Sequence, residues 1–288
     1  MTETVLVTGA TGFIGKPLVA RLRADGQDVV AIGSAQGDIT DPATLRPLAN
    51  RRIRHVVHLA GRTYVPESWD DPQAFFHTNA GGTLNVLQLC RAAGASLTFL
   101  SAYIYGIPER LPIAEDAPAR PNNPYALSKH FAEEACRFYA EHFEVAVTVL
   151  RPFNVYGPGQ SDRFLIPKVL QQILRAKEIE ILDLKPRRDW LFVEDLVDAV
   201  AAARRAPSGY NVYNLGSGVS HSVEELIQLI QEVTNTHLPV RSKTAQRENE
   251  IDDTVADIGK ARVGLSWTPC VTLRDGIKRC LEAMNYKP

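Results

Sequence analysis

The chain has 288 residues, of which 45% are hydrophobic and 23% are charged, a composition typical of a globular protein. Its formal net charge of −1 gives no general attraction to nucleic acid or to an anionic membrane, and no apolar run reaches the roughly 18 residues of a membrane span. The first residues lack a signal-peptide pattern, and four cysteines without Cys-x-x-Cys spacing favour a reducing compartment, so a cytoplasmic protein is expected.

Strand and helix patterns alternate through the first half of the chain. Apolar runs predict strands at 5–7, 29–32, 55–60, 97–100 and 145–150, with helices through 18–22, 83–90 and 125–142 between them. Short apolar strands separated by helices indicate a parallel sheet that is covered on both faces. The expected fold class is therefore α/β, with a doubly wound parallel sheet of the Rossmann type.

The alternation loosens after Gly157-Pro158-Gly159. Helices are predicted over 165–176, 193–205 and 222–233, with strands at 179–182 and 212–215. Ser222 and Glu225 have the spacing of a capping box. We expect a first domain over residues 1–155 and a smaller, mixed C-terminal lobe over 156–288, with residues at about 190–215 returning to the first domain. The cleft between the two is the expected active site.

A glycine-rich turn, Thr8-Gly9-Ala10-Thr11-Gly12-Phe13-Ile14-Gly15, follows the first strand and opens the first helix. Glycine allows the tight turn and a close backbone approach, while the helix N-terminus offers N–H groups to a pyrophosphate. The turn therefore predicts a dinucleotide site. The second strand ends at Gly33-Ser34, without the acid that binds an NAD ribose or an arginine for a 2′-phosphate, so NAD and NADP both stay open.

Tyr125 and Lys129 lie four residues apart, on one face of a helix that starts after Pro121-Asn122-Asn123-Pro124. A free tyrosine has a pKa of about 10, and an ammonium on the same helix face, helped by the positive charge of an oxidised nicotinamide, is expected to lower it. Tyr125 could then exchange a proton with a substrate oxygen while a hydride passes to or from a nicotinamide. Ser101 follows the strand at 97–100 and could hydrogen-bond the reacting oxygen. A hydride-transfer enzyme is the leading prediction.

No metal site is expected, because His55 and His58 are three residues apart on a strand and point to opposite faces. Cys90 and Cys136 lie on helical patterns and are predicted to be small core residues.

With these motifs, the chain resembles the extended short-chain dehydrogenase/reductase family, which includes nucleotide-sugar epimerases, dehydratases and reductases. The similar segments are Thr8–Gly15, Asp38-Ile39, His58–Gly61, Asn79, Ser101–Gly106, Tyr125 with Lys129, Arg151–Gly159, Arg188–Trp190 and Asn214–Gly216. The resemblance implies NAD or NADP as cofactor, residues 1–155 as the dinucleotide-binding domain and 156–288 as the substrate lobe. It implies Ser101, Tyr125 and Lys129 as the catalytic trio. The implied cofactor contacts are Gly9, Gly12, Phe13, Ile14, Gly15, Asp38, Ile39, Leu59, Ala60, Gly61 and Asn79, together with Tyr125 and Lys129.

The resemblance also implies a clamp for the diphosphate of a nucleotide sugar. Asn154, Arg188 and Arg247 match the positions that grip it, and a guanidinium suits bidentate phosphate recognition. Asn154 could instead be a turn residue. Arg247 could be a surface charge, since Gln246 and Glu248 depart from the usual Arg-Pro-Gly pattern.

Departures from the family pattern narrow the activity. Ala102-Tyr103 follow Ser101 where sugar 4,6-dehydratases have Asp-Glu, which disfavours that reaction. The segments 64–69 and 184–190 resemble branches that process GDP-linked deoxysugars, so a 4-keto reductase is slightly favoured and a 4-epimerase stays open. A reductase of a neutral carbonyl compound and a non-catalytic dinucleotide sensor are the alternatives. The family resemblance further implies a homodimer, through helices near 83–92 and 125–142.

Overall fold

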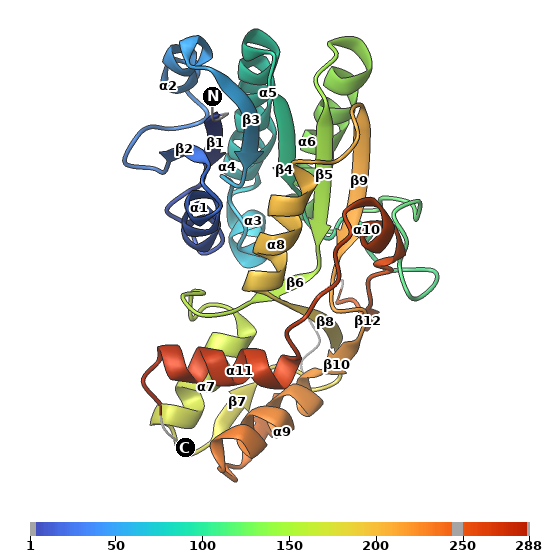
Figure 1. The fold of residues 1–288 in the computed structure, drawn as a ribbon. Helices are drawn as coiled ribbons and strands as arrows, with labels where there is room; N and C mark the ends of the chain where they lie inside the picture. Colours follow the sequence, from blue (N-terminus) through green and yellow to red (C-terminus); the bar gives the residue numbers. More distant parts are fainter. Residues whose placement is uncertain (1–3, 244–249, 287–288) are drawn as a thin grey trace.

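The structure, a computed structural model, describes residues 4–243 and 250–286 (Figure 1). Six strands form its central sheet: β1 (Thr4–Thr8), β2 (Asp28–Ile32), β3 (Ile53–His58), β4 (Ser96–Leu100), β5 (Val147–Pro152) and β9 (Tyr210–Leu215). They lie in the order β2-β1-β3-β4-β5-β9, and all neighbours are parallel. The predicted doubly wound α/β sheet is confirmed.

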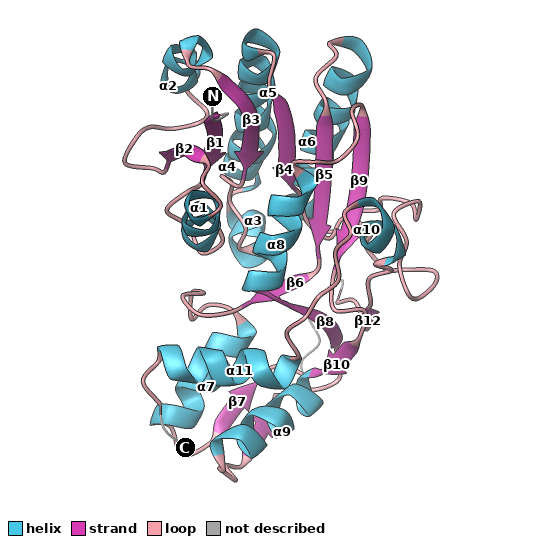
Figure 2. Ribbon diagram, in the orientation of Figure 1, coloured by secondary structure: helices cyan, strands magenta, loops and turns pink. Residues whose placement is uncertain are grey.

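Helices cover both faces of this sheet, which explains why its strands are continuously apolar. Four long helices form the two layers: α1 (Gly15–Ala24) and α8 (Val193–Ala203) on one face, α5 (Gly82–Ala93) and α6 (Pro124–His142) on the other (Figure 2). Val5 and Val7 of β1 pack toward the first layer, and Leu6 packs toward the second. This alternation is the side-chain pattern that a strand buried on both faces requires.

The order of the strands places a topological switch point between β1 and β3. From β1 the chain moves to β2 at one edge of the sheet, and it then crosses to β3 on the other side of β1. Ligands of open parallel sheets bind outside the carboxyl ends of the strands at such a point. The loops after β1 and β3 therefore flank the expected dinucleotide site.

A smaller lobe follows the sheet and lies below it in Figure 1. Its helices are α7 (Leu165–Arg175), α9 (Val223–Thr234) and α11 (Leu273–Ala283), which pack around β7 (Ile179–Ile181) and its parallel partner β11 (Val240–Ser242). The capping box that starts α9 is confirmed, since Glu225 N donates to Ser222 Oγ at 3.0 Å and Ser222 N donates to Glu225 Oε2 at 2.9 Å.

A third, small sheet lies at the junction of the two parts. It contains β6 (Asn154–Tyr156), β8 (Arg187–Phe192), β10 (Ser220–Ser222) and β12 (Asp253–Thr254), with β8 in the middle. The sequence patterns did not predict β8, because Arg187, Arg188 and Asp189 interrupt its apolar run. The remaining elements are α2 (Pro42–Leu45), the short helix η1 (Arg46–Asn50), α3 (Val65–Asp70), α4 (Pro72–Phe75), the π-helical turn η2 (Phe76–Gly81) and α10 (Gly259–Gly264).

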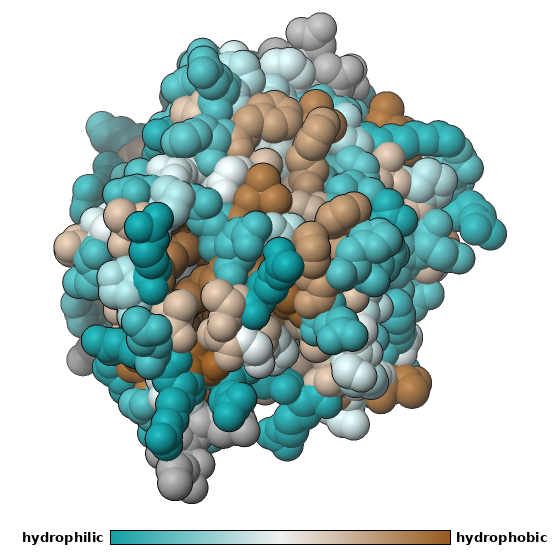
Figure 3. Space-filling view, turned by 90° about the horizontal axis from the view of Figure 1, so that it is seen from above, coloured by the Kyte–Doolittle hydropathy of each residue, from teal (hydrophilic) through white to brown (hydrophobic). Residues whose placement is uncertain are grey.

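Cys90 and Cys136 are buried as predicted, and all four cysteines are free. Seen from above, where the strands of the central sheet begin, the surface is mostly hydrophilic, and its apolar residues gather in the middle of the view (Figure 3). Within residues 4–243 and 250–286, every helix is too short or too polar to cross a membrane.

Candidate active site

A cavity of about 910 Å³ opens at the carboxyl end of the central sheet. Its wall includes most of the residues that the sequence predicted for the site: Gly9, Gly12, Phe13, Ile14, Gly15, Asp38, Ile39, Leu59, Ala60, Gly61, Ser101, Tyr125, Lys129 and Asn154. The expected cofactor turn and the expected catalytic trio therefore face one space.

The turn after β1 has the shape of a pyrophosphate cradle. Gly9 has a φ of +68°, and a Cβ there would lie 2.7 Å from the backbone nitrogen of Ala60, so glycine is required. Gly12 N donates to Gly9 O at 3.0 Å and closes the turn. Ile14 stands at the N-cap of α1, and its aliphatic side chain cannot cap the first N–H groups of the helix. The cradle fits the phosphates of a dinucleotide.

A buried histidine holds the ends of β1 and β3 together beneath this cradle. His58 Nδ1 lies 2.7 Å from Thr8 Oγ1, and its Nε2 lies 3.0 Å from Thr83 Oγ1 on α5. Burial lowers the pKa of His58 to about 3, so the ring is neutral at physiological pH. It therefore fixes the geometry of the cradle without adding charge.

The part of the cavity beyond β2 is lined by Gly33, Ser34, Asp38 and Ile39. Asp38 Oδ1 accepts a hydrogen bond from Thr40 N at 2.9 Å, which lowers the pKa of the carboxyl group. Asp38 is therefore ionised at neutral pH and available to an adenine amino group.

Asn79, which the resemblance places among the cofactor contacts, is buried in this structure. Its side chain is buried behind the loop that follows β3, where Oδ1 accepts from Arg62 N at 2.8 Å and Nδ2 donates to Arg62 O at 3.1 Å. Nδ2 also donates to Ser128 Oγ on α6 at 2.9 Å. Asn79 positions the loop and does not form part of the cavity wall.

Helix α6 carries two of the predicted catalytic side chains into the cavity. Asn123 accepts from Ala126 N at 2.9 Å and Pro124 occupies the first turn, which starts the helix at the cavity edge. Lys129 Nζ donates to Leu100 O, at the end of β4, at 2.7 Å.

Ser101 continues β4 into the cavity wall, since its backbone N–H donates to Leu150 O at 2.8 Å. Among the described residues, its buried Oγ has no hydrogen-bond partner. A buried hydroxyl is normally paired, so this one is suited to a bound ligand.

Burial shifts the pKa values of both Tyr125 and Lys129 in the protein without ligand. Burial raises the pKa of Tyr125 above its usual range. Burial also lowers the pKa of Lys129, to about 8. Desolvation is the cause of the shift at Tyr125 and the largest cause of the shift at Lys129 in the protein without ligand. The predicted lowering of the tyrosine pKa includes the positive charge of an oxidised nicotinamide, and it stays a prediction for the protein with its cofactor bound.

The three residues of the predicted diphosphate clamp have different positions. Asn154 lines the cavity, and its Nδ2 donates to Asp189 O at 3.3 Å. Arg188 lies on β8 outside the cavity wall, where it forms an ion pair with Glu250 and donates to Ile251 O at 2.7 Å. Arg247 lies outside the described residues.

Arg188 is nonetheless close to the cavity, because its charge acts on Tyr103, a residue of the cavity wall. Burial raises the pKa of Tyr103, and the charge of Arg188 partly offsets that increase. Tyr103 lines the cavity beside Ser101. The neighbouring Asp189 fixes β8, because its carboxylate accepts from Gly218 N and Ala256 N, both at 3.0 Å.

Two loops complete the cavity wall, and the sequence analysis predicted neither of them as part of the site. Arg62, Thr63 and Val65 follow β3, and Gln160, Ser161 and Phe164 precede α7. Across them, the Tyr64 and Phe164 rings meet edge to face at 5.9 Å, and Arg163 pairs with Glu67 at 2.7 Å. The first loop follows a predicted strand, which was the available signal, whereas the second follows β6, which the sequence patterns did not predict.

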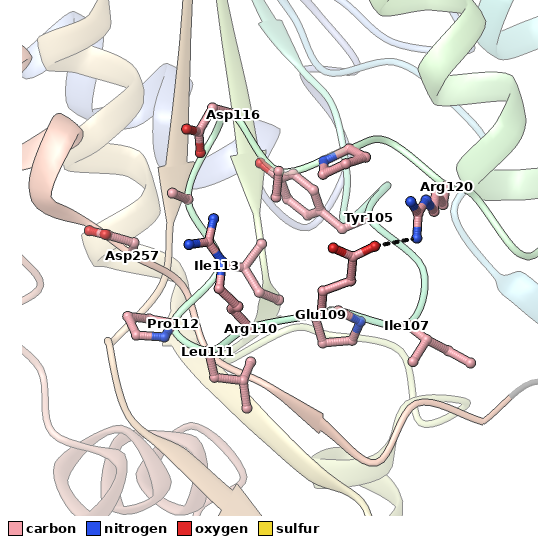
Figure 4. Close-up of a pocket in the computed structure, with 14 residues that line it drawn as sticks. Tyr105, Ile107, Glu109, Arg110, Leu111, Pro112, Ile113, Asp116, Arg120 and Asp257 are labelled. Atoms are coloured by element: carbon pink, nitrogen blue, oxygen red, sulfur yellow. Dashed lines mark hydrogen bonds and ion pairs between the residues drawn. The ribbon is translucent and has the colours of Figure 1, made fainter.

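A second cavity, of about 390 Å³, lies in the loop between β4 and α6 (Figure 4). Glu109 and Arg120 face one another at its edge and form an ion pair at 2.7 Å. It contains none of the predicted catalytic residues, so the larger cavity is the candidate active site.

Residues 5–216 match the model of a family described as "NAD dependent epimerase/dehydratase family". The chain is 34% identical to GDP-6-deoxy-D-mannose reductase of Pseudomonas aeruginosa, over 98% of this chain and 97% of the relative. It is 31% identical to UDP-glucose 4-epimerase of Mycolicibacterium smegmatis, over 98% of each. The structure of RMD from Pseudomonas aeruginosa complexed with NADPH superposes with a TM-score of 0.90 at 32% identity, covering 98% of both chains.

Proposed function

The chain belongs to the NAD dependent epimerase/dehydratase family, and on that premise we propose that it transfers hydride at C4 of a nucleotide-linked sugar. A 4-keto reductase of a GDP-linked deoxysugar is favoured over a 4-epimerase, and similarity to relatives of both kinds supports this pair of activities. The observation that carries the proposal is the single cavity that contains both the glycine turn and the Ser101, Tyr125 and Lys129 side chains.

In the reducing direction, the Tyr125 hydroxyl gives its proton to the carbonyl oxygen of the substrate. The raised pKa of Tyr125 suits this step, because the phenol stays protonated at neutral pH. The unpaired Ser101 hydroxyl donates a hydrogen bond to the same oxygen. Lys129 places positive charge beside the phenolate as it forms. When bound, NAD(P)H supplies the hydride.

The substrate's diphosphate is held by Asn154, Arg188 and Arg247 in this proposal. Arg188 must exchange its bond to Glu250 for phosphate oxygens, which it can do because the ion pair lies beside the cavity-lining Tyr103. A neutral carbonyl substrate would offer these residues no diphosphate to bind. A dinucleotide sensor without catalytic activity would not require Ser101, Tyr125 and Lys129 together in its cavity.

A turnover assay with NADH or NADPH and a 4-keto sugar linked to GDP tests the proposal. A reductase oxidises the nicotinamide in proportion to product and exchanges its dinucleotide between turnovers. An epimerase converts its substrate without net oxidation and retains the dinucleotide, which a native mass spectrum of the purified protein would detect. Turnover of neutral ketones alone would overturn the nucleotide-sugar assignment.

We also infer that the enzyme is a cytoplasmic homodimer, paired through α5 and α6. Phe131 and Phe138 are seven residues apart on one face of α6, and their exposed fractions are 55% and 51%. Leu84 on α5 is 43% exposed. Exposed apolar side chains on two packed helices are typical of a partner-binding face.

Light scattering at micromolar concentration is expected to give twice the chain mass. Phe131→Glu should shift the protein toward the monomer, because a carboxylate would be buried in the interface. Val263→Glu is the matched control, since Val263 is 83% exposed on α10. A monomer mass for the unchanged protein would remove the dimer.

A further inference from the structure

A buried ion pair lies one helical turn beyond Lys129. Arg151 of β5 grips Glu133 of α6 with three hydrogen bonds: Nε to Oε1 at 3.0 Å, Nε to Oε2 at 3.1 Å, and Nη2 to Oε2 at 2.6 Å. The two side chains are 9% and 1% exposed. Removing two charges from water is costly, so a buried ion pair adds little to the stability of a fold. A role other than stability is therefore worth seeking for this pair.

The pair is fixed from several elements at once. Arg151 Nη1 donates to Tyr105 Oη at 2.8 Å, and the Tyr105 hydroxyl donates to Asn214 Oδ1 of β9 at 2.6 Å. Asn214 Nδ2 in turn donates to Ile113 O at 2.9 Å. Burial opposes the charge on Arg151, but its bonds to Glu133 outweigh this and raise its pKa. Glu133 is therefore held in place by Arg151, which stays positively charged.

Glu133 also faces the catalytic end of α6. Tyr125, Lys129 and Glu133 are spaced four residues apart and share one face of the helix. Lys129 is 4% exposed and sits over the Phe99 ring, 4.6 Å from its centroid, with the Leu100 carbonyl as hydrogen-bond acceptor. A neutral carbonyl and an aromatic ring cannot balance a full positive charge.

The other titratable groups around Lys129 are neutral at pH 7. Burial raises the pKa of Tyr125 and of Cys136 on the same helix. Burial lowers the pKa of His58, which faces Lys129 from β3, to about 3. Among the described residues that act on Lys129, Glu133 is therefore the counter-charge.

We propose that Glu133, locked by Arg151, is a positioning residue that keeps Lys129 protonated beside Tyr125. The inference deepens the proposed hydride transfer and rests on it only for the kinetic readout. Burial lowers the pKa of Lys129 to about 8 and Glu133 opposes that decrease, in agreement with the geometry. Without Glu133, Lys129 would lose its proton near neutral pH, and the positive charge beside the phenolate would be lost.

Glu133→Gln is expected to lower the pKa of Lys129 on the order of one unit, the usual scale for a nearby opposite charge. The pKa is read from the 15N and 13C shifts of Lys129 in lysine-labelled protein without ligand, assigned with Lys129→Met. Because the ammonium is the active form, the basic limb of the kcat profile should move to lower pH by a similar amount. Glu133→Asp should restore both.

Glu134→Gln is the matched control, because Glu134 is the next residue on α6, is 49% exposed and pairs with Arg137 on the surface. If Glu133→Gln does not fold, the double variant Glu133→Met, Arg151→Met removes both members of the ion pair, so that neither Glu133 nor Arg151 is left buried without its partner. It should lower the pKa of Lys129 by less than Glu133→Gln does, since the carboxylate that raises this pKa is removed together with the neighbouring Arg151 cation.

An unchanged Lys129 pKa in a folded Glu133 variant overturns the inference. An unchanged basic limb together with a shifted Lys129 pKa also overturns it, because the charge would then have no part in turnover. Failure of the proposed function looks different: the unchanged protein would have no activity on nucleotide sugars, while the Lys129 titration would still respond to Glu133.

Discussion

Tyr125→Phe is expected to lower kcat by about 10²–10⁴-fold, the usual contribution of a positioned proton donor. Only the hydroxyl is removed. The ring keeps its edge-to-face contact with Phe75, at a centroid distance of 6.3 Å, so the cavity wall is retained. Dinucleotide affinity should stay within a few-fold of the unchanged protein, because the glycine turn after β1 is untouched.

Steady-state kinetics with a fluorescence titration of NADH or NADPH checks this expectation. Tyr139→Phe is the matched control, because Tyr139 lies on the same helix and its hydroxyl accepts from Gln88 Nε2 at 2.6 Å. That variant should lose a little stability and keep kcat. A Tyr125→Phe enzyme with normal kcat would refute the assigned proton donor.

The burial of Tyr125 also decides the protonation state of its hydroxyl in the protein without ligand. Because burial raises the pKa of Tyr125, its side chain is the phenol and not the phenolate at pH 7. Reduction of a carbonyl needs the donor, whereas oxidation of a hydroxyl needs the base. Oxidation needs additional positive charge near the phenol to lower its pKa.

The sheet could be predicted from sequence because each of its strands is locally apolar. Val5, Leu6 and Val7 are fully buried, and three consecutive apolar residues next to a glycine turn are visible in the sequence. Strand β8 was not predicted, because its polar side chains form their hydrogen bonds with residues that are distant in the sequence. Asp189, for example, bonds to backbone N–H groups 29 and 67 residues away. No local pattern reports such partners.

Some features of the candidate site could be predicted from the sequence in the same way, and others could not. Gly9, Ser101 and Tyr125 could be placed because strand ends and helix starts fix where they emerge, and all three line the cavity. The pKa of Tyr125 could not be predicted, since it depends on burial by the whole fold. The partner of Arg188 could not be predicted either, because Glu250 is 62 residues away in sequence.

Arg188→Ala is expected to raise KM for the nucleotide sugar about 10- to 150-fold, the equivalent of one charge-assisted hydrogen bond of roughly 1.5–3 kcal/mol. A guanidinium that grips the diphosphate does so in the ground state and the transition state alike, so kcat should change less than KM. Dinucleotide affinity should be nearly unchanged.

Arg187→Ala is the matched control for this variant. Arg187 precedes Arg188 on β8, so its side chain points to the opposite face of the strand, where it pairs with Glu225 at 3.0 Å. Its loss should leave KM unchanged. Glu250→Gln should act in the reverse direction to Arg188→Ala and tighten nucleotide binding, because the substrate would no longer compete with the Glu250 carboxylate for Arg188.

Titration calorimetry with UDP, GDP, CDP and dTDP measures these effects without turnover and also identifies the base. GDP is expected to bind best if the enzyme is the favoured reductase, and its affinity should fall in Arg188→Ala by the same factor as the rise in KM. Equal binding by Arg188→Ala and the unchanged protein would remove Arg188 from the clamp. If none of the four diphosphates binds the unchanged protein, the anion that Asn154 and Arg188 were assigned to hold does not exist, and a neutral carbonyl compound becomes the substrate.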